Sequence, residues 1–371
     1  MRVITGVLLL TGAALAEPLF NVKVQDLKTG NLDWNKFKTA LATDGAFSVT
    51  GLSSDYLNAV QALSDVAPNC FKSQRLPKII LADGSIRSTY ATNIENAYPD
   101  CILEAGSIIN QEFSVVFNIV AGSLEQVIGA ERLSYKENED GEERMFSSLQ
   151  YKDHIHVYES IDSKQNEDLS LSFHTDSGVL LMLTPAPELP LLVKNIHNEL
   201  VDTSTTPDNS IIFIIARGLP DWLLRGTPEA AEFFTAPHAV PSLKGRTITR
   251  TVFARMMVAP LQAIPSDVKT HKTQFQDIFL QRMVEKPGEL CPLDLTTEDL
   301  AKDNNECGDD PELALCWMSC LVVPDCNGDE KVVCTNLVGE ACCSEYDSPD
   351  GCLDMDTTCE WKCEAENILP F

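Results

Sequence analysis

Apolar residues recur every three or four positions through much of the first 130 residues. This spacing covers residues 33–43, 53–66 and 100–130, and it predicts three helices. The third pattern is long and mostly apolar, and Gly122 marks the point where that helix could break. Residues 45–51 are bounded by glycines and alternate in polarity, so they predict a short strand.

The period of the pattern changes from His154 onward. Apolar and polar residues then alternate in segments separated by Pro, Gly, Asn and Asp, which is typical of short strands joined by turns. The predicted strands span residues 154–161, 169–183, 190–194, 210–215 and 246–258, and a helical pattern returns over residues 270–284. Helices followed by short strands predict a β-sandwich or barrel that carries a helical layer.

The first 16 residues differ from this patterned part. They combine Arg2, an apolar run and a small-residue cleavage site ending at Ala16, which is typical of a secretory signal peptide. Elsewhere, no stretch reaches the roughly 18 apolar residues that a membrane-spanning helix needs. We therefore expect a product without a membrane span that is secreted or resides in the lumen of the secretory pathway.

Residues 287–371 form an acidic, cysteine-rich tail. They hold 21 acidic residues against three lysines, within a net charge of −27, and this charge disfavours nucleic acid and anionic membranes as partners. Eleven of the 13 cysteines lie here, and the other two are Cys70 and Cys101. In an oxidising compartment they predict disulfide bonds, although the sequence does not fix their pairing. Zinc is disfavoured because no histidine follows His271. The tail is a candidate for binding a protein partner.

Three residues of the strand-rich part have side chains that can bind a metal. His174 and Asp176 are two positions apart on a predicted strand, so they should project to the same side, and His238 follows on another strand. Two imidazoles and one carboxylate on one face leave the remaining coordination positions of Fe(II) open. The set therefore indicates an oxygenase rather than a structural zinc site. A zinc hydrolase is disfavoured because the chain lacks a His-Glu-x-x-His motif.

Two arginines lie on the last predicted strand of this part. Arg246 and Arg250 share a face with Val252, and an inward-facing arginine on an apolar strand requires an anionic partner. A dicarboxylate cosubstrate would supply one, since the guanidinium group binds a carboxylate through two hydrogen bonds. An internal salt bridge is the alternative.

These motifs resemble the isopenicillin N synthase-like family of Fe(II)/2-oxoglutarate-dependent dioxygenases. Residues 25–67, with the segment Asp-Gly-Ala-Phe at 44–47, are similar to the family's N-terminal region, and residues 154–260 to its catalytic domain. The resemblance implies a mixed α and β fold, namely a double-stranded β-helix (jelly roll) with an N-terminal helical layer. To this the chain adds a small disulfide-rich C-terminal region.

The resemblance also implies a division of the chain and a cofactor set. We expect a signal peptide at 1–16, the N-terminal helical region at 17–150, and the catalytic β-helix with its closing helix at 151–286. The acidic tail follows at 287–371. The implied cofactor is Fe(II), the implied cosubstrate is 2-oxoglutarate, and ascorbate is an optional further cofactor.

Carried over by position, the resemblance assigns a role to six residues. The implied iron ligands are His174, Asp176 and His238. Arg250 is implied to bind the distal carboxylate of 2-oxoglutarate, with Tyr158 as a further contact. Arg246 is the alternative anchor for that carboxylate, because the interval from His238 to Arg250 is longer than usual.

Two functions remain open from the sequence. The first is an oxygenase of the secretory pathway that hydroxylates or otherwise oxidises a small molecule or a peptidyl side chain. The second is a non-catalytic secreted module with a degenerate oxygenase fold and a partner-binding tail. The complete ligand set and Arg250 favour the first function. His156 and Val252 stand where the family usually has Asn and Ser or Thr, and they favour the second.

Overall fold

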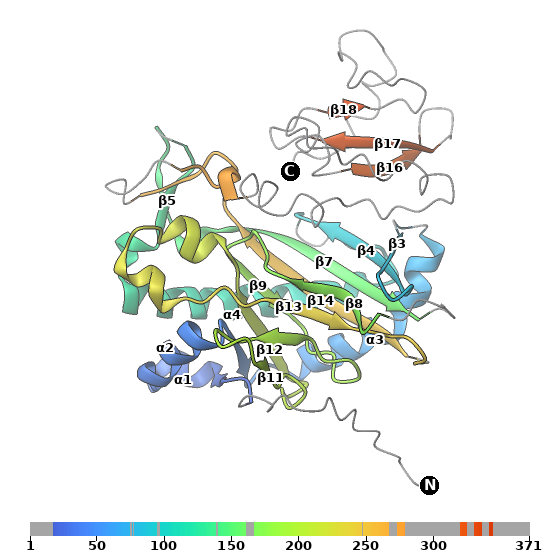
Figure 1. Ribbon diagram of the computed structural model, residues 1–371, viewed down its shortest axis with the longest axis horizontal. Helices are drawn as coiled ribbons and strands as arrows, with labels where there is room; N and C mark the ends of the chain where they lie inside the picture. Colours follow the sequence, from blue (N-terminus) through green and yellow to red (C-terminus); the bar gives the residue numbers. More distant parts are fainter. Residues whose placement is uncertain are drawn as a thin grey trace.

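In the computed structural model, the described residues are 18–278 without 75, 77, 95–96, 139, 161–166, 247 and 267–272, together with the backbone of three tail strands. The expected signal peptide lies outside this range, as does most of the tail (Figure 1). The tail strands are β16 (Cys320–Pro324), β17 (Glu330–Thr335) and β18 (Ala341–Cys343), which pair antiparallel.

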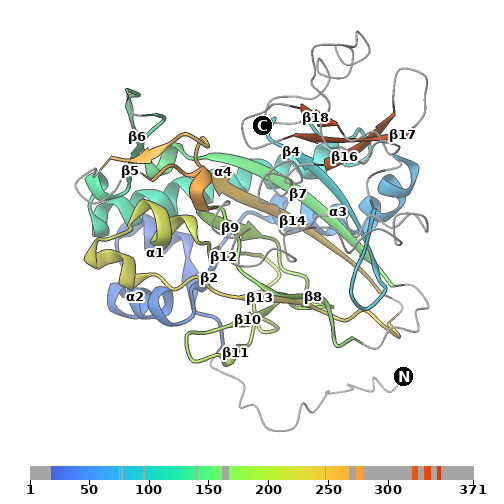
Figure 2. The ribbon, with the colours of Figure 1, turned by 45° about the horizontal axis from the view of Figure 1, so that its top comes forward.

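Two β-sheets build the centre of the protein. The order of the major sheet is β1 (Asn21–Lys23), β2 (Ala46–Thr50), β12 (Ser210–Ile215), β9 (Leu180–Leu183), β14 (Thr249–Val258), β7 (Gln150–Glu159), β4 (Ile86–Thr92) and β3 (Lys78–Ile80). The order of the minor sheet is β11 (Leu200–Val201), β10 (Leu192–Lys194), β13 (His238–Pro241) and β8 (Leu169–His174). Figure 2 shows the minor sheet in front of the major one.

From β7 to β14 the chain passes back and forth between the two sheets. Strands β7, β9, β12 and β14 belong to the major sheet, whereas β8, β10, β11 and β13 belong to the minor sheet. A cluster of buried side chains from both sheets lies between them and includes Leu183, Ile212, Val193 and Val240. Apolar alternation with a period of two places such residues on the facing surfaces. This arrangement confirms the predicted double-stranded β-helix.

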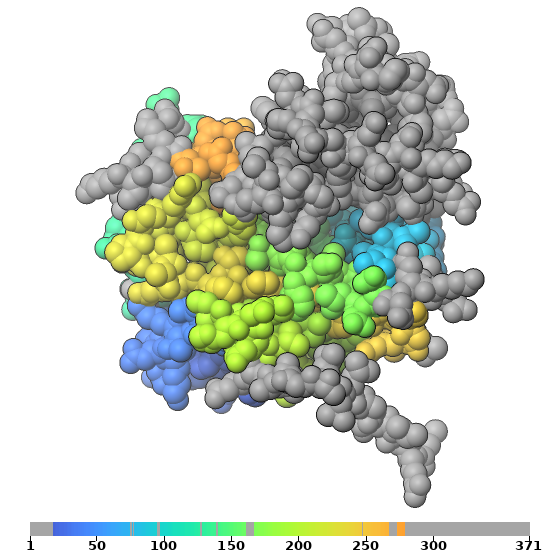
Figure 3. All heavy atoms as spheres, in the orientation of Figure 1, coloured from blue at the N-terminus to red at the C-terminus, as the bar shows by residue number. Residues whose placement is uncertain are grey.

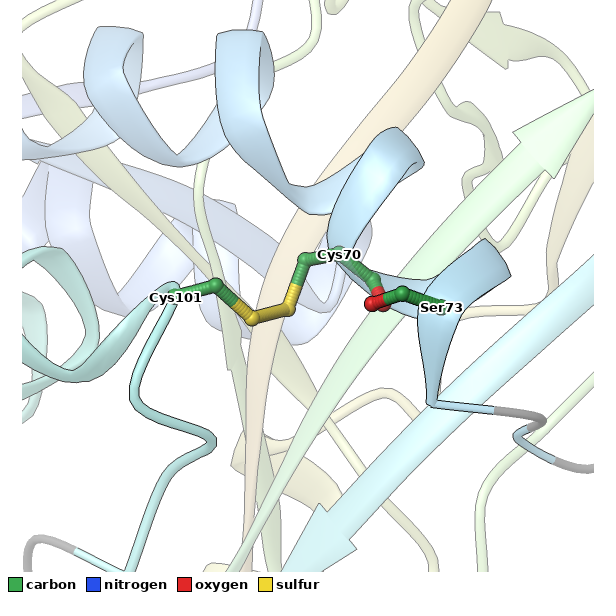
Figure 4. Close-up of a disulfide and its surroundings, with 3 residues drawn as sticks. All are labelled: Cys70, Ser73 and Cys101. Atoms are coloured by element: carbon green, nitrogen blue, oxygen red, sulfur yellow. A yellow bond between two sulfur atoms is a disulfide. The ribbon is translucent and has the colours of Figure 1, made fainter.

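Four helices cover the other face of the major sheet. They are α1 (Val24–Thr29), α2 (Trp34–Thr43), α3 (Ser54–Ser73) and α4 (Leu103–Ile128), and α4 continues through Gly122 without a break. Ser53 accepts a hydrogen bond from the Tyr56 amide and thereby caps the start of α3. The disulfide Cys70–Cys101 joins the C-terminal part of α3 to the segment just before α4 (Figure 4).

Smaller elements complete the described part of the chain. Strands β5 (Ser134–Lys136), β6 (Glu143–Met145) and β15 (Ile264–Pro265) form a three-stranded sheet. The short helices are η1 (Ala130–Arg132), η2 (Phe146–Ser148), η3 (Gly218–Leu223) and η4 (Pro228–Glu232). None of the described helices has the length and apolar character that crossing a bilayer requires.

The structure corrects the prediction of one strand over residues 169–183. This segment forms β8 and β9, which lie in different sheets, and the chain crosses between them at residues 175–179. Gly178 lies in this crossing, where a β-carbon would collide with the side chain of Met256 and the backbone of Met257. The absence of a side chain at Gly178 therefore lets the crossing pass close to β14.

Other differences lie at the ends of the predicted elements. The last strand begins at Thr249 instead of residue 246, because residues 243–246 form a turn closed by a hydrogen bond from the Arg246 amide to Leu243 O. The expected N-terminal helical region also supplies β1, β3 and β4, which the apolar pattern did not indicate. Of the helix expected at 270–284, residues 276–278 are helical and 273–275 are not, and the remainder lies outside the described residues.

A buried ion pair connects α4 to the major sheet. Arg255 donates from Nε to Asp153 Oδ1 at 2.7 Å and from Nη2 to Oδ2 at 2.9 Å. Arg255 also donates to Ser114 Oγ in α4, and Asp153 accepts from Tyr98 and from Asn110 in α4. Because both charges are 1% exposed, each depends on the other for compensation.

We therefore expect Arg255→Met to lower the free energy of unfolding by about 3–5 kcal/mol, because it leaves the Asp153 carboxylate buried without a counter-charge. The double variant Arg255→Met with Asp153→Leu should recover part of this loss. Urea unfolding of the three proteins measures the difference. Equal losses in the single and the double variant would contradict the explanation.

A second buried carboxylate ties the β3–β4 turn to the minor sheet. Asp83 accepts hydrogen bonds from Ser85, from Ser170 in β8, and from Ser242 and the Leu243 amide after β13. Burial raises the pKa of Asp83, but these hydrogen bonds outweigh burial and bring the pKa below the ordinary value of 3.8. Figure 3 shows the cyan β3–β4 region beside the green strand β8.

The depressed pKa of Asp83 gives a pH-dependent contribution to stability. It is present above the unfolded pKa of 3.8 and is lost as the pH falls through the lower pKa of the folded state. Asp83→Asn should therefore lower the free energy of unfolding by about 2 kcal/mol at neutral pH, and the difference should shrink at acidic pH. Urea unfolding across this range measures it, and a difference that grows with acidity would contradict the assignment.

Candidate metal centre

His174, Asp176 and His238 converge at one end of the minor sheet. His174 is the last residue of β8, His238 is the first of β13, and the antiparallel register sets the two residues opposite each other. Their ring centroids are 4.4 Å apart. The Asp176 carboxylate lies 3.8 Å from His174 Nε2 and 3.4 Å from His238 Nε2. The three ligand atoms all lie within 4.8 Å of one another.

Asp176 does not lie on a strand. The convergence of Asp176 with His174 was predicted from a shared strand, and that explanation is wrong. The prediction placed His174 and Asp176 on one strand, but β8 ends at His174 and Asp176 lies in the crossing to β9. The Arg217 amide donates to Asp176 O at 2.9 Å and holds this part of the crossing in place. The convergence therefore depends on the crossing between the sheets and not on alternation along a strand.

Both imidazoles are oriented by backbone carbonyl groups. His174 Nδ1 lies 2.9 Å from Ser172 O, and His238 Nδ1 lies 3.2 Å from Ala236 O. An imidazole whose Nδ1–H donates to a carbonyl keeps its Nε2 lone pair for a metal, and such partners are typical of metal-binding histidines. Ligand atoms around a first-row metal lie about 2.0–2.2 Å from the ion and so roughly 3–4 Å from one another. The observed separations fit a metal ion.

Arg250 lies in the interior and has Tyr158 as its neighbour. The residues pair across β14 and β7, and the guanidinium carbon lies 5.0 Å from the centroid of the tyrosine ring. Arg250 Nε donates to Leu189 O at 3.0 Å. Burial lowers the pKa of Arg250, and Tyr158, through its charge and a side-chain hydrogen bond, and the charge of Glu188 oppose this effect. Within the described part of the chain, no carboxylate lies within salt-bridge distance of Arg250.

Arg246, the alternative anchor, lies elsewhere. Its side chain is exposed, and the residue belongs to the turn that precedes β14. A small cavity of about 10 Å³ lies beside Arg250 and is lined by Leu183, Leu191, Thr206 and Ile212, among others. A larger surface hollow of about 480 Å³ lies at β1 and β2 and contains none of the predicted site residues.

The inner face of β7 adds two histidines to this region. The rings of His154 and His156 stack with centroids 5.6 Å apart, and His156 Nδ1 lies 2.9 Å from Thr89 Oγ1 in β4. Burial is the main cause that lowers the pKa of His154 to about 3, and it also lowers the pKa of His156 well below 6.5. Both imidazoles are therefore neutral at physiological pH. The charge of Asp176 acts on His154, so His154 lies near the metal ligands.

Sequence reasoning missed Arg87, a further charged residue near these groups. Arg87 lies on β4 opposite Tyr158, and its positive charge acts on both His154 and His156. Strand β4 was not predicted, so no pattern placed Arg87 at this site. The alternation of Arg87, Thr89 and Ala91 along one face is visible only once the pairing with β7 is known.

Comparison with solved structures identifies the fold. The rice dioxygenase for auxin oxidation matches with a TM-score of 0.51 and 15% identity, over 72% of this chain and 95% of that one. A candidate oxygenase from Shewanella oneidensis matches with a TM-score of 0.54 and 14% identity, over 73% and 100%. JOX2, solved in complex with 2OG, Fe and JA, matches with a TM-score of 0.50 and 13% identity, over 71% and 84%.

The sequence itself gives no such match. Neither a protein-family model nor a curated protein matches this chain. At identities of 13–15%, the structural likeness shows that the chain shares the fold of these oxygenases. Its chemistry has to be argued from its own residues.

The metal site can be tested by thermal unfolding under argon. A ligand that binds only the folded state at 100 times its dissociation constant stabilises it by about 2.7 kcal/mol. We therefore expect Fe(II) or Co(II) to raise the unfolding temperature of the wild type and of His197→Ala, because His197 is exposed and lies outside the site. His238→Ala should lose the shift. An equal shift in His238→Ala would exclude this metal site.

Proposed function

We propose that this protein is an Fe(II)/2-oxoglutarate-dependent oxygenase. The observation that carries the proposal is the convergence of His174, Asp176 and His238 at one end of a double-stranded β-helix. Two imidazoles and one carboxylate on one side of an ion match the ligand set of non-haem iron oxygenases and leave coordination positions open. The structure of JOX2 with 2OG and Fe supports this cofactor set for the fold.

Arg250 supports 2-oxoglutarate as the cosubstrate. Its Nε donates to Leu189 O and its guanidinium group also hydrogen-bonds with the Tyr158 side chain, which leaves its other terminal N–H groups as donors for a carboxylate. The Tyr158 ring lies against the guanidinium group and favours a fixed orientation of its plane. Because Arg250 is 2% exposed, an anion bound there would interact with it in a site with little water.

The bound iron would supply activation of dioxygen, with 2-oxoglutarate as the reductant, and the chain would supply position and environment. His174, Asp176 and His238 would bind the ion from one side and leave its other coordination positions open. Arg250 fixes the far end of the cosubstrate. The neutral His154 and His156 line the same face of the sheet without adding charge.

Val252 is the feature that favours a weaker site or a non-catalytic module. It is buried, and it stands where the family that the chain resembles usually has a Ser or Thr whose hydroxyl contacts the cosubstrate carboxylate. One such hydrogen bond contributes about 0.5–1.5 kcal/mol, which corresponds to an affinity loss of up to roughly tenfold. This loss is compatible with activity, so Val252 does not displace the proposal.

The location and the substrate are further parts of the proposal. The residue pattern at 1–16 supports entry into the secretory pathway, and the Cys70–Cys101 disulfide supports an oxidising compartment. The substrate would be a small molecule or a peptidyl side chain that reaches the open side of the iron. The acidic, cysteine-rich tail would bind a protein partner.

The cosubstrate assignment predicts a visible absorbance band. Protein loaded with Fe(II) under argon should gain a charge-transfer band when 2-oxoglutarate is added, and His174→Ala should lose it. Arg250→Gln should raise the 2-oxoglutarate concentration for half-maximal absorbance about ten- to hundredfold, since a hydrogen-bonded charge is lost. Arg246→Gln is the matched control and should leave it unchanged.

Two results would overturn parts of this assignment. Wild-type protein that binds Fe(II) but never gains the band would exclude 2-oxoglutarate and favour the non-catalytic module. A shift in Arg246→Gln without one in Arg250→Gln would transfer the anchor to Arg246.

A further inference from the structure

Arg87 is an inward-facing cation that the proposed mechanism does not use. It pairs with Tyr158 across β4 and β7, and Tyr158 pairs with Arg250 across β7 and β14. Residues opposite each other in antiparallel strands project to the same face, so the three side chains form one row on the inner face of the major sheet. Tyr158 occupies the middle of this row.

Among the described residues, no carboxylate forms a salt bridge with the guanidinium group of Arg87. The Nε of Arg87 is buried and has no hydrogen-bond partner. A buried donor without a partner is unfavourable, and more so when it is charged. Arg87 therefore resembles Arg250, since both point inward and neither has a carboxylate partner in the described part of the chain.

One cosubstrate cannot neutralise both arginines. The two positive charges of Fe(II), the single negative charge of Asp176 and the two negative charges of 2-oxoglutarate leave one negative charge, which Arg250 balances. The charge of Arg87 then remains. Lys152, another cation on β7, has an interaction of its own, whereas the buried Nε of Arg87 has no hydrogen-bond partner.

Arg87 also lies at a distance from Arg250, the proposed anchor of the cosubstrate. Arg87 and Arg250 are two strands apart, so their backbones are separated by roughly 10 Å, with Tyr158 on the strand between them. The charges of Asp176 and Arg87 both act on His154, so His154 lies near the candidate iron ligands and near Arg87, which is opposite Tyr158 further along β7. A molecule above His154 and His156 would therefore extend from the open side of the iron to Arg87.

We propose that the substrate of this enzyme carries a carboxylate, and that the guanidinium group of Arg87 binds it beside the iron site. The inference rests on the oxygenase function proposed above and names its substrate class. Arg87 offers two parallel donors to a planar carboxylate, and the neutral imidazoles of His154 and His156 contact the part of the substrate between the carboxylate and the iron. Since a single positive charge remains, a monocarboxylate fits better than a phosphate monoester.

Matched pairs of ligands test this inference. Octanoate and octanamide, and phenylbutyrate and phenylbutyramide, differ only in the charged group. We would titrate each into protein loaded with Fe(II) and 2-oxoglutarate under argon and measure the dissociation constant by calorimetry. The acid should bind about ten- to hundredfold more tightly than its amide. Arg87→Gln should abolish this preference and retain the 2-oxoglutarate band.

Three variants provide the controls. Arg225→Gln removes an exposed arginine and should leave the preference for the acid unchanged. Arg250→Gln should weaken the 2-oxoglutarate band without removing the preference. Arg87→Lys keeps the charge but loses the two parallel donors, so it should retain part of the preference, and it serves as the test if Arg87→Gln does not fold.

The outcomes separate this inference from the function on which it rests. If the band forms but no acid binds more tightly than its amide, or Arg87→Gln keeps the preference, the inference fails and the oxygenase proposal stands. If Arg87→Gln abolishes the band and Arg250→Gln does not, Arg87 anchors the cosubstrate and the inference fails. Tighter binding of octyl phosphate than of octanoate would also overturn it. If the wild type does not form the 2-oxoglutarate band, the proposed oxygenase function is wrong. The claim that the bound anion is a substrate is then wrong as well.

Discussion

The pairing of β8 with β13 is the constraint on which the metal centre depends. Its register sets His174 opposite His238 at the end of the minor sheet. A slip of one residue in either strand would turn one imidazole to the opposite face, since side chains alternate with a period of two. The third ligand adds a second requirement. Asp176 reaches the imidazoles only because the chain leaves β8 there and crosses to the major sheet, so the site exists only when both sheets are assembled.

In the central strands of the major sheet, residues on one face stabilise the fold, and residues on the other face line the candidate site. Along β7, Asp153 faces the helices and forms the buried ion pair with Arg255, whereas His154 faces the interior beside the metal ligands. Along β14, Arg255 and Arg250 are directed to opposite faces in the same way. The ion pair and its contacts with α4 fix the position of these strands from behind. This support holds the inner residues in place without occupying the site.

Most of the fold and the three residues that converge at the candidate metal centre could be predicted from the sequence, and the failures have physical reasons. His174, Asp176 and His238 were selected because two imidazoles and one carboxylate, followed by an arginine on a later strand, are typical of an iron site, and the structure brings the three residues together. The crossing at 175–179 was missed because apolar residues flank it on both sides and no proline interrupts them. Strand β4 was missed because its inner face carries Arg87 and Thr89 instead of apolar residues. A strand that lines a polar site loses the apolar alternation by which strands are recognised.

The arginines of the interior contrast with the charge of the whole chain. With 55 acidic against 28 basic residues, the protein as a whole repels anions, and this repulsion is screened within about 8–10 Å at physiological salt. Long-range attraction therefore does not bring an anionic ligand to the site. Affinity has to come from short-range contacts inside the β-helix, where Arg250 is buried and Arg87 is half-buried, since charges interact more strongly where water is partly excluded. The two inward arginines are thus better explained as contacts for bound anions than as a means of attracting them.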